Sequence, residues 1–292
     1  MTQKVNEADI NTKYEDGSTP LITAVTMNRA DIVEELIGLG ADVNEKSGGG
    51  HNALTYAAMM MAQPRDRPAI SREINPKIIE LLVENGADTH EAMMVAINTG
   101  CDSFARIAIE AGADADDADE DGRTLVMYSV MSGGGILRTL LEGGADPDIP
   151  DNKGRTPLMI AAIDDEADPQ VMDTLLEFGV NINKPDSRGI TPLMWAVINA
   201  ERQPDIMMPA LIRTGGLRAE GWQAWCAFLA LYAAAKRELQ LDTVRRLISE
   251  GADVNVVDKR GMNAMMYALM DGDDEIADIL AEAGATINFD MH

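Results

Sequence analysis

The sequence predicts an all-α solenoid of about eight helix-turn-helix units, here called repeats, joined by β-hairpin finger loops. A motif of the form Thr-Pro-Leu recurs every 32 to 39 residues along the 292-residue chain. A second motif, Gly-Ala-Asp, follows most copies, and apolar residues at helical spacing lie between the two. Repetition at this period is the signature of an array in which each repeat packs only on its neighbours.

The Thr-Pro-Leu motif predicts the start of the first helix in each repeat. Threonine can cap a helix through its hydroxyl, and proline suits the first turn because no intrahelical donor is lost there. Weaker copies keep the register at residues 52, 91, 229 and 263. The clear copies are Thr19-Pro20-Leu21, Thr124-Leu125, Thr156-Pro157-Leu158 and Thr191-Pro192-Leu193.

The Gly-Ala-Asp motif predicts the end of the second helix, because glycine readily adopts the left-handed conformation that terminates a helix. An Asp-x-x-Gly turn precedes the Thr-Pro-Leu motif at residues 151–154 and 186–189. The seventh repeat is the poorest copy: it lacks this turn and carries Trp222 and Trp225 in an apolar run. We expect a single domain over residues 1–292, with repeats near 12–44, 45–88, 89–116, 117–148, 149–183, 184–218, 219–255 and 256–290.

The formal net charge of −25 limits the classes of partner that the protein can bind. Such a surface repels nucleic-acid phosphates and anionic membranes, and it speeds encounter with a basic partner. The most apolar stretch, 224–235, is too short to cross a bilayer, and Cys101 and Cys226 form no disulfide or metal motif. We therefore expect a cytoplasmic protein that binds neither nucleic acid nor membrane directly.

The residues that carry catalytic or metal chemistry do not form a complete site. Asp117, Asp119 and Asp121 match the first half of a calcium loop, but Tyr128 stands where the bidentate glutamate is needed. The three histidines, His51, His90 and His292, have no neighbouring partner at metal or triad spacing. We expect no enzyme, no cofactor and no metal.

The turn and helix motifs together resemble the ankyrin repeat, most closely at residues 151–158 and 186–193. The resemblance spans about residues 12–290, and it implies a concave face lined by finger tips and first helices. Ankyrin repeats usually carry a histidine after Thr-Pro-Leu, which hydrogen-bonds between neighbouring repeats. We interpret the residues in this position here, mainly methionine, as core packing. They are Ile22, Thr55, Met94, Met127, Met159, Met194, Tyr232 and Met266.

The register of the repeats also predicts which side chains face the concave groove. They form a Met/Ile stripe flanked by basic fingers and one basic insert, 61–76, which contacts either the partner or the protein's own acidic surface. The predicted partner-binding residues are Met27, Met59, Met60, Arg65, Arg67, Arg72, Arg123, Met131, Arg155, Ile163, Arg188, Ile198, Lys236, Arg237, Arg260 and Met270.

These features predict a protein–protein interaction module that acts as an adaptor, scaffold or inhibitor and is a monomer on its own. Its expected partner is a protein held in the concave groove, and the charge favours a basic one. The alternative is an acidic mimic of nucleic acid, such as an immunity or anti-defence inhibitor that blocks the basic cleft of a nuclease or other DNA-binding protein.

Overall fold

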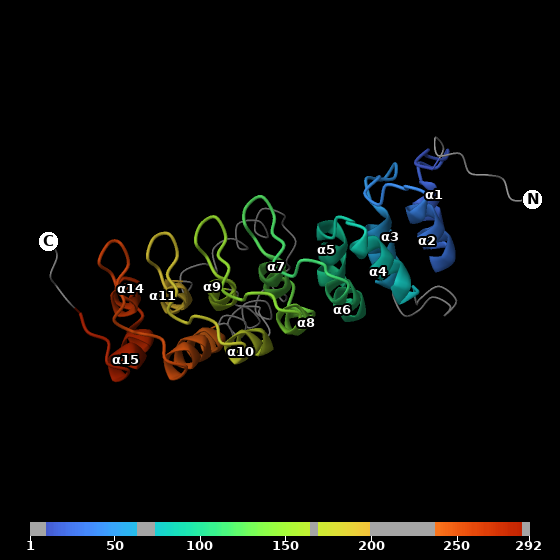
Figure 1. Ribbon diagram of the computed structural model, residues 1–292. Helices are drawn as coiled ribbons and strands as arrows, with labels where there is room; N and C mark the ends of the chain where they lie inside the picture. Colours follow the sequence, from blue (N-terminus) through green and yellow to red (C-terminus); the bar gives the residue numbers. More distant parts are fainter. Residues whose placement is uncertain (1–9, 63–73, 164–168, 199–236, 288–292) are drawn as a thin grey trace, which may run out of the picture. The chain divides into compact units, whose positions relative to one another are not determined.

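The computed structural model describes residues 10–62, 74–163, 169–198 and 237–287 (Figure 1). The chain divides into two compact units, Met1–Ile149 (unit 1) and Pro150–His292 (unit 2). Within the described residues the only β pairing is an isolated bridge between Ala118 and Thr124. The predicted all-α class is confirmed, and the finger loops are tight turns with almost no strand character.

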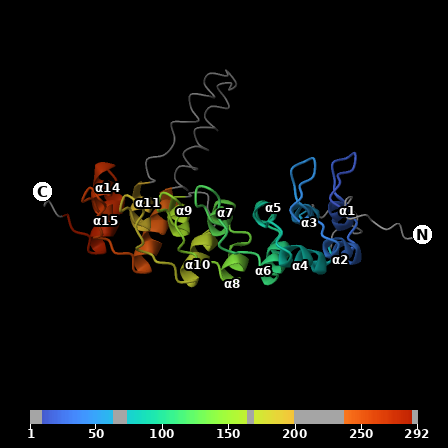
Figure 2. The ribbon, with the colours of Figure 1, turned by 45° about the horizontal axis from the view of Figure 1, so that its top comes forward.

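Unit 1 consists of helix pairs, and we call each pair a layer. The first helices α1, α3, α5 and α7 pack on one another in order, and so do the second helices α2, α4, α6 and α8, which form one row in Figure 2. The pairs are α1 (Pro20–Thr26) with α2 (Ala30–Gly38), α3 (Ala53–Met61) with α4 (Pro76–Glu84), α5 (His90–Thr99) with α6 (Asp102–Glu110), and α7 (Leu125–Met131) with α8 (Leu137–Glu142).

Unit 2 repeats the same plan. Its first helices are α9 (Pro157–Ile163), α11 (Pro192–Ile198) and α14 (Ala264–Met270), and α11 packs on both α9 and α14. The second helices are α10 (Pro169–Glu177), the helical residues 237–249, and α15 (Asp274–Glu282). In Figure 1 the finger loops of this unit stand above the first helices, and the second helices lie below them.

The helices begin where the first motif predicts. The hydroxyl of Thr19 accepts a hydrogen bond from the backbone N–H of Ile22, and that of Thr124 accepts one from Met127. Asn263 caps α14 in the same way through its side-chain oxygen. These caps satisfy N–H groups that have no partner within the helix, so each first helix starts at a defined residue.

The position that carries histidine in most ankyrin repeats is part of the core in five repeats, as predicted, but Met94 and Met266 are only half-buried there and Tyr232 lies outside the described residues. Ile22, Met127, Met159 and Met194 are buried, and Thr55 is completely enclosed. The flexible thioether can fill an irregular gap between two layers without requiring a hydrogen-bond partner. Met127, Met159 and Met194 therefore contribute to the packing between layers.

Each finger loop of unit 2 is built around an aspartate, for which Asp151 is the example. Its backbone N–H donates to the carbonyl of Arg155 at 2.9 Å and closes the turn. Its side-chain oxygen Oδ1 accepts from the backbone N–H groups of Lys153 and Arg155. Gly154 adopts a φ of +80°, which a residue with a Cβ rarely adopts, and this explains the Asp-x-x-Gly spacing.

Neighbouring layers are also joined through asparagine. The side chain of Asn44 donates to the carbonyl of Gly86 and accepts from the N–H of Asp88, in the next layer. Asn255 makes the same two bonds to Gly284 and Thr286. This pair of bonds therefore identifies which layers are consecutive.

The asparagine bonds and the finger contacts place residues 184–198 and 237–255 in one layer. Asn183 donates to Gly251 and accepts from Asp253, so the next layer after Asn183 ends at residues 251–253. The helical residues 237–249 lie between α10 and α15 (Figure 1), and Arg246 pairs with Asp173 of α10.

This layer differs from the expected boundary between repeats 184–218 and 219–255. Residues 199–236, with Trp222 and Trp225, lie outside the described residues. The local motifs predict where helices start and stop, but they carry no information on which first helix a second helix packs against. The expected continuous domain over 1–292 stays a prediction.

Candidate functional site

The exposed sides of the first helices form the surface that we call the first-helix face, in each unit separately. In unit 1, Met27 at the end of α1 is 65% exposed and Met131 of α7 is 44% exposed. Met59 and Met60 of α3 are half-buried. Two other large apolar side chains of unit 1, Tyr14 and Leu39, are also exposed, but they lie outside the first helices.

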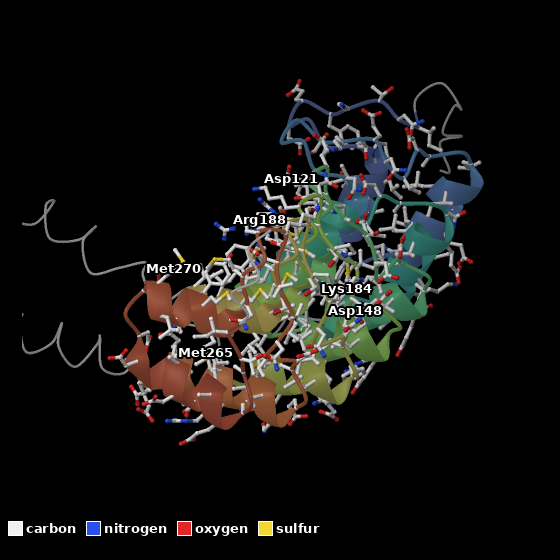
Figure 3. The ribbon with its side chains drawn as sticks, turned by 90° about the vertical axis from the view of Figure 1, so that its left-hand side faces the viewer. Asp121, Asp148, Lys184, Arg188, Met265 and Met270 are labelled. Carbon is white, nitrogen blue, oxygen red and sulfur yellow. The ribbon has the colours of Figure 1, made fainter. Side chains whose placement is uncertain are left out.

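The first-helix face of unit 2 has the same character. Met270 of α14 is 72% exposed and Leu269 is 44% exposed, and Figure 3 shows Met270 at the end of its helix. Ile163 of α9 and Ile198 of α11 are half-buried at the equivalent helix ends. Packing of α9, α11 and α14 in order therefore brings these predicted apolar residues onto one row.

Other predicted binding residues lie outside the described residues or on a second helix. Arg65, Arg67 and Arg72 of the insert, and Lys236, lie outside the described residues. Arg237 belongs to a second helix instead of a first helix, since its guanidinium contacts the carboxylate of Asp273 beside α15. The sequence placed it wrongly because the register of the seventh repeat assigned residues 229–236 to a first helix.

The predicted finger arginines lie on the described fingers, and each is paired with an acid. Both Nε and a terminal nitrogen of Arg155 contact one oxygen of Asp151, at 2.7 and 2.6 Å. Burial raises the pKa of Asp151, but hydrogen bonds from Arg155 and Lys153 outweigh it, so the pKa lies below its usual value. The carboxylate is ionised at neutral pH and holds the arginine in place.

Arg188 and Arg260 are held by an acid and an aromatic ring. The guanidinium of Arg188 lies 4.7 Å from the ring centre of Trp195 and 3.2 Å from Asp186. Arg260 lies 5.4 Å from the ring centre of Tyr267 and 3.1 Å from an oxygen of Asp258. Cation–π contact and ion pairing thus fix both side chains at the finger tips. Figure 3 shows Arg188 projecting from the fingers.

The aromatic partners were missed by sequence reasoning, although a signal exists. Each aromatic residue follows its finger aspartate by nine positions, as Tyr267 follows Asp258 and Trp195 follows Asp186. In unit 1, Tyr128 follows Asp119 at the same spacing and donates its hydroxyl to it at 2.5 Å. The hydrogen bond from Tyr128 lowers the pKa of Asp119 and outweighs its slight desolvation.

Two of the histidines considered for chemistry, His51 and His90, make structural contacts with acidic residues, and His292 lies outside the described residues. Nδ1 of His90 lies 2.8 Å from a carboxylate oxygen of Asp117, and that of His51 lies 2.5 Å from Glu91. Both pairs join neighbouring layers of unit 1. The described residues hold no group of three or more potential metal ligands, and they include no helix long and apolar enough to span a membrane.

Comparison with known families supports this architecture. A family model described as ankyrin repeats in three copies matches residues 69–151, 135–208 and 217–291. A second model, described as ankyrin repeats in many copies, matches residues 5–57. No curated protein matches the chain. Ankyrin repeats generally mediate protein–protein interaction, and proteins built from them are typically not enzymes.

Proposed function

Because this chain belongs to the ankyrin-repeat family, we propose that it is an adaptor, scaffold or inhibitor that binds one protein partner along its first-helix face. The observation that carries the proposal is the exposure of Met27 and Met131 in unit 1 and of Met270 in unit 2. A flexible thioether adapts to the shape of a partner, and apolar area at the centre of an interface supplies much of the binding free energy. On this proposal the protein is cytoplasmic and acts without a catalytic step.

The paired arginines support the same proposal. A protein interface places polar groups around an apolar centre. Arg155, Arg188 and Arg260 are held at the fingers by their aspartates. Side chains ordered before binding lose less conformational entropy when a partner contacts them. The fingers of unit 2 therefore provide a polar border beside the apolar ends of α9, α11 and α14.

The test is a pull-down from native lysate with apolar positions changed to arginine. We expect Met27→Arg with Met131→Arg, or Met270→Arg alone, to release the co-purifying protein. Leu39→Arg is the matched control, because Leu39 is 44% exposed but follows the second helix α2. Circular dichroism should show the same helix content in all variants. The proposal is wrong if every captured protein remains bound to both first-helix variants.

The acidic nucleic-acid mimic is a second candidate, and the fingers of unit 1 favour it. Residues 117–121 carry Asp117, Asp119, Glu120 and Asp121, and such a cluster suits the basic cleft of a DNA-binding protein. Affinity for the captured partner, measured across a salt series, separates the two candidates. A shallow dependence contradicts the mimic, and a steep loss with salt in a partner that Met27→Arg with Met131→Arg still binds favours the mimic over the apolar first-helix face.

A further inference from the structure

The finger loops of the two units carry opposite charge. In unit 2 the fingers at 151–155, 184–190 and 256–262 contain six basic and three acidic residues, although the whole chain has a net charge of −25. The fingers of unit 1, at 13–18, 45–51 and 117–123, contain seven acidic and three basic residues. The same type of loop therefore presents a different sign of charge in each unit.

Burial of the acids strengthens the contrast in unit 2. The side chains of Asp151, Asp186 and Asp258 are only 2%, 2% and 1% exposed. Their oxygens accept hydrogen bonds from the finger backbone and from arginine side chains. In contrast, the side chains of Arg188 and Arg260 are 60% and 66% exposed. The exposed charge on the fingers of unit 2 is therefore mainly positive.

Backbone hydrogen bonds join the three finger tips of unit 2 in series. The N–H of Ser187 donates to the carbonyl of Lys153 at 3.1 Å, and the N–H of Lys259 donates to the carbonyl of Arg188 at 3.0 Å. Gly189 permits this approach, since a Cβ there would lie 3.0 Å from the Lys259 nitrogen. The tips thus form one edge, and Lys153 and Lys259 are both exposed on it.

We propose that this basic finger edge, formed by Lys153, Arg188, Lys259 and Arg260, binds an acidic peptide segment. The proposal rests on the proposed function and adds the charge of the partner segment that contacts unit 2. Arg188 and Arg260 are ordered in advance by their aromatic and acidic neighbours. Lys153 and Lys259 supply positive charge in excess of the arginine–aspartate pairs.

A short acidic segment fits this edge better than a nucleic acid does. Electrostatic attraction is screened beyond about 8–10 Å at physiological ionic strength, so the edge attracts anions only locally. A nucleic acid carries regularly spaced charge along its whole length and would extend over the acidic surface of a protein with a net charge of −25. A peptide with a few acidic residues can contact the edge alone.

The test measures fluorescence anisotropy of the full-length protein with a labelled peptide of alternating glutamate and serine. A peptide with glutamine in place of glutamate and a single-stranded DNA oligonucleotide of equal charge are the comparison probes. We expect the glutamate peptide to bind at low ionic strength and the other two to bind more weakly. Lys153→Gln with Lys259→Gln should weaken its binding roughly tenfold.

The matched control is Lys13→Gln with Lys46→Gln, which makes the same change in net charge on the fingers of unit 1. It should leave the affinity for the glutamate peptide unchanged. The proposal is overturned if both double variants lose the same affinity for the glutamate peptide. It is also overturned if the unaltered protein does not bind this peptide, or if it binds the oligonucleotide more tightly. Dimerisation at low ionic strength that the Lys153 and Lys259 changes abolish would overturn it too, since a second copy would then occupy the edge.

The pull-down separates this proposal from the proposed function. If Met270→Arg releases the captured protein while the Lys153 and Lys259 changes affect neither that protein nor the peptide, the basic finger edge is wrong and the first-helix face stands. If the methionine variants retain every partner but the lysine variant loses the glutamate peptide, the edge stands and the first-helix proposal is wrong.

Discussion

The side-chain oxygen of Asn183 accepts a hydrogen bond from the backbone N–H of Asp253 at 2.8 Å, although the two residues are 70 positions apart. In unit 1 the same bond joins Asn44 to Asp88, which are 44 positions apart. The bond spans one layer in both cases. The long separation in unit 2 therefore reflects an interruption within a layer, between α11 and the helical residues 237–249.

The first prediction concerns the ion pair between Arg237 and Asp273, which joins residues 237–249 to the start of α15. A double-mutant cycle with Arg237→Gln and Asp273→Asn should give a coupling free energy of about 1–2 kcal/mol, because the Asp273 side chain is only 9% exposed. The asparagine can still cap α15 at Ile276. Urea denaturation of the four proteins measures the coupling.

The control cycle uses Arg245 and Asp242, whose atoms are 3.6 Å apart and whose side chains are 48% and 65% exposed. It should give a coupling near zero, as is usual for exposed pairs. Equal coupling in both cycles would contradict the docking of residues 237–249 against α15.

A second prediction concerns Asp116, which occupies the position of Asn44 in its own layer. Its oxygen accepts from the N–H of Asp146 at 2.7 Å, but a carboxylate has no N–H to donate to the Gly144 carbonyl. We expect Asp116→Asn to add this bond and raise the free energy of unfolding by about 0.5–1 kcal/mol. The reciprocal change Asn44→Asp should lower it by a similar amount, as measured by urea denaturation. A loss of stability in Asp116→Asn would contradict the assignment.

A third prediction concerns Ser129 in α7. The residue is 1% exposed, and its hydroxyl has no hydrogen-bond partner within the described part of the chain. The equivalent position in α9 is Ala161, which is also buried. Since an unsatisfied buried hydroxyl is costly, Ser129→Ala should stabilise the protein by about 1 kcal/mol.

The reverse change, Ala161→Ser, should destabilise the protein to a comparable extent. Thermal unfolding followed by circular dichroism checks both variants. Destabilisation by Ser129→Ala would mean that the hydroxyl makes a bond in solution.

A fourth prediction concerns acid stability. Burial raises the pKa of Asp258, but hydrogen bonds from Tyr267, Met262 and Arg260 outweigh it, and the pKa lies below its usual value. A carboxylate with a lowered pKa stabilises the folded state above the unfolded pKa of about 3.9, and this contribution is lost as the pH falls through the lower folded value. We therefore expect the urea midpoint to be steady near neutral pH and to fall below about pH 4.

Asp258→Asn should lower stability at pH 7 by about 1–3 kcal/mol, because the amide nitrogen cannot accept from Tyr267 or Arg260. It should also lose less stability than the unaltered protein on acidification. Asp242→Asn is the control, since that side chain is 65% exposed, and it should change little at either pH. An identical acid response in Asp258→Asn and the unaltered protein would rule out this role for Asp258.

Most of the fold could be predicted from local signals in the sequence. Thr19 and Thr124 cap helices as predicted, and Met127, Met159 and Met194 are buried in the position that the repeat register assigned to the core. These features depend on residues within a few positions of one another, so a single sequence contains them. The Met/Ile stripe follows for the same reason, because helical spacing alone places Met131 or Met270 on the outer side of its first helix.

Side-chain contacts that depend on the folded structure could not be predicted from the sequence. The spacing of Asp258 and Tyr267 is visible in the chain, but only folding shows that the tyrosine hydroxyl donates to the carboxylate at 2.7 Å beneath Arg260. Arg237 was assigned to a first helix because its neighbours resemble one. In the structure its guanidinium contacts Asp273 and joins the helical residues 237–249 to the start of α15.

Local signals in the sequence are therefore enough to predict the repeated helix pair, the caps and the turn chemistry. Each is a local preference repeated along the chain. Tertiary contacts were needed to show that α11 packs on α14 and that residues 237–249 complete the layer of α11. They also showed that the acids of the unit 2 fingers are buried, whereas Lys153, Arg188, Lys259 and Arg260 are exposed. Packing partners and burial depend on which surfaces meet, and the same local motif can meet any neighbour of similar shape.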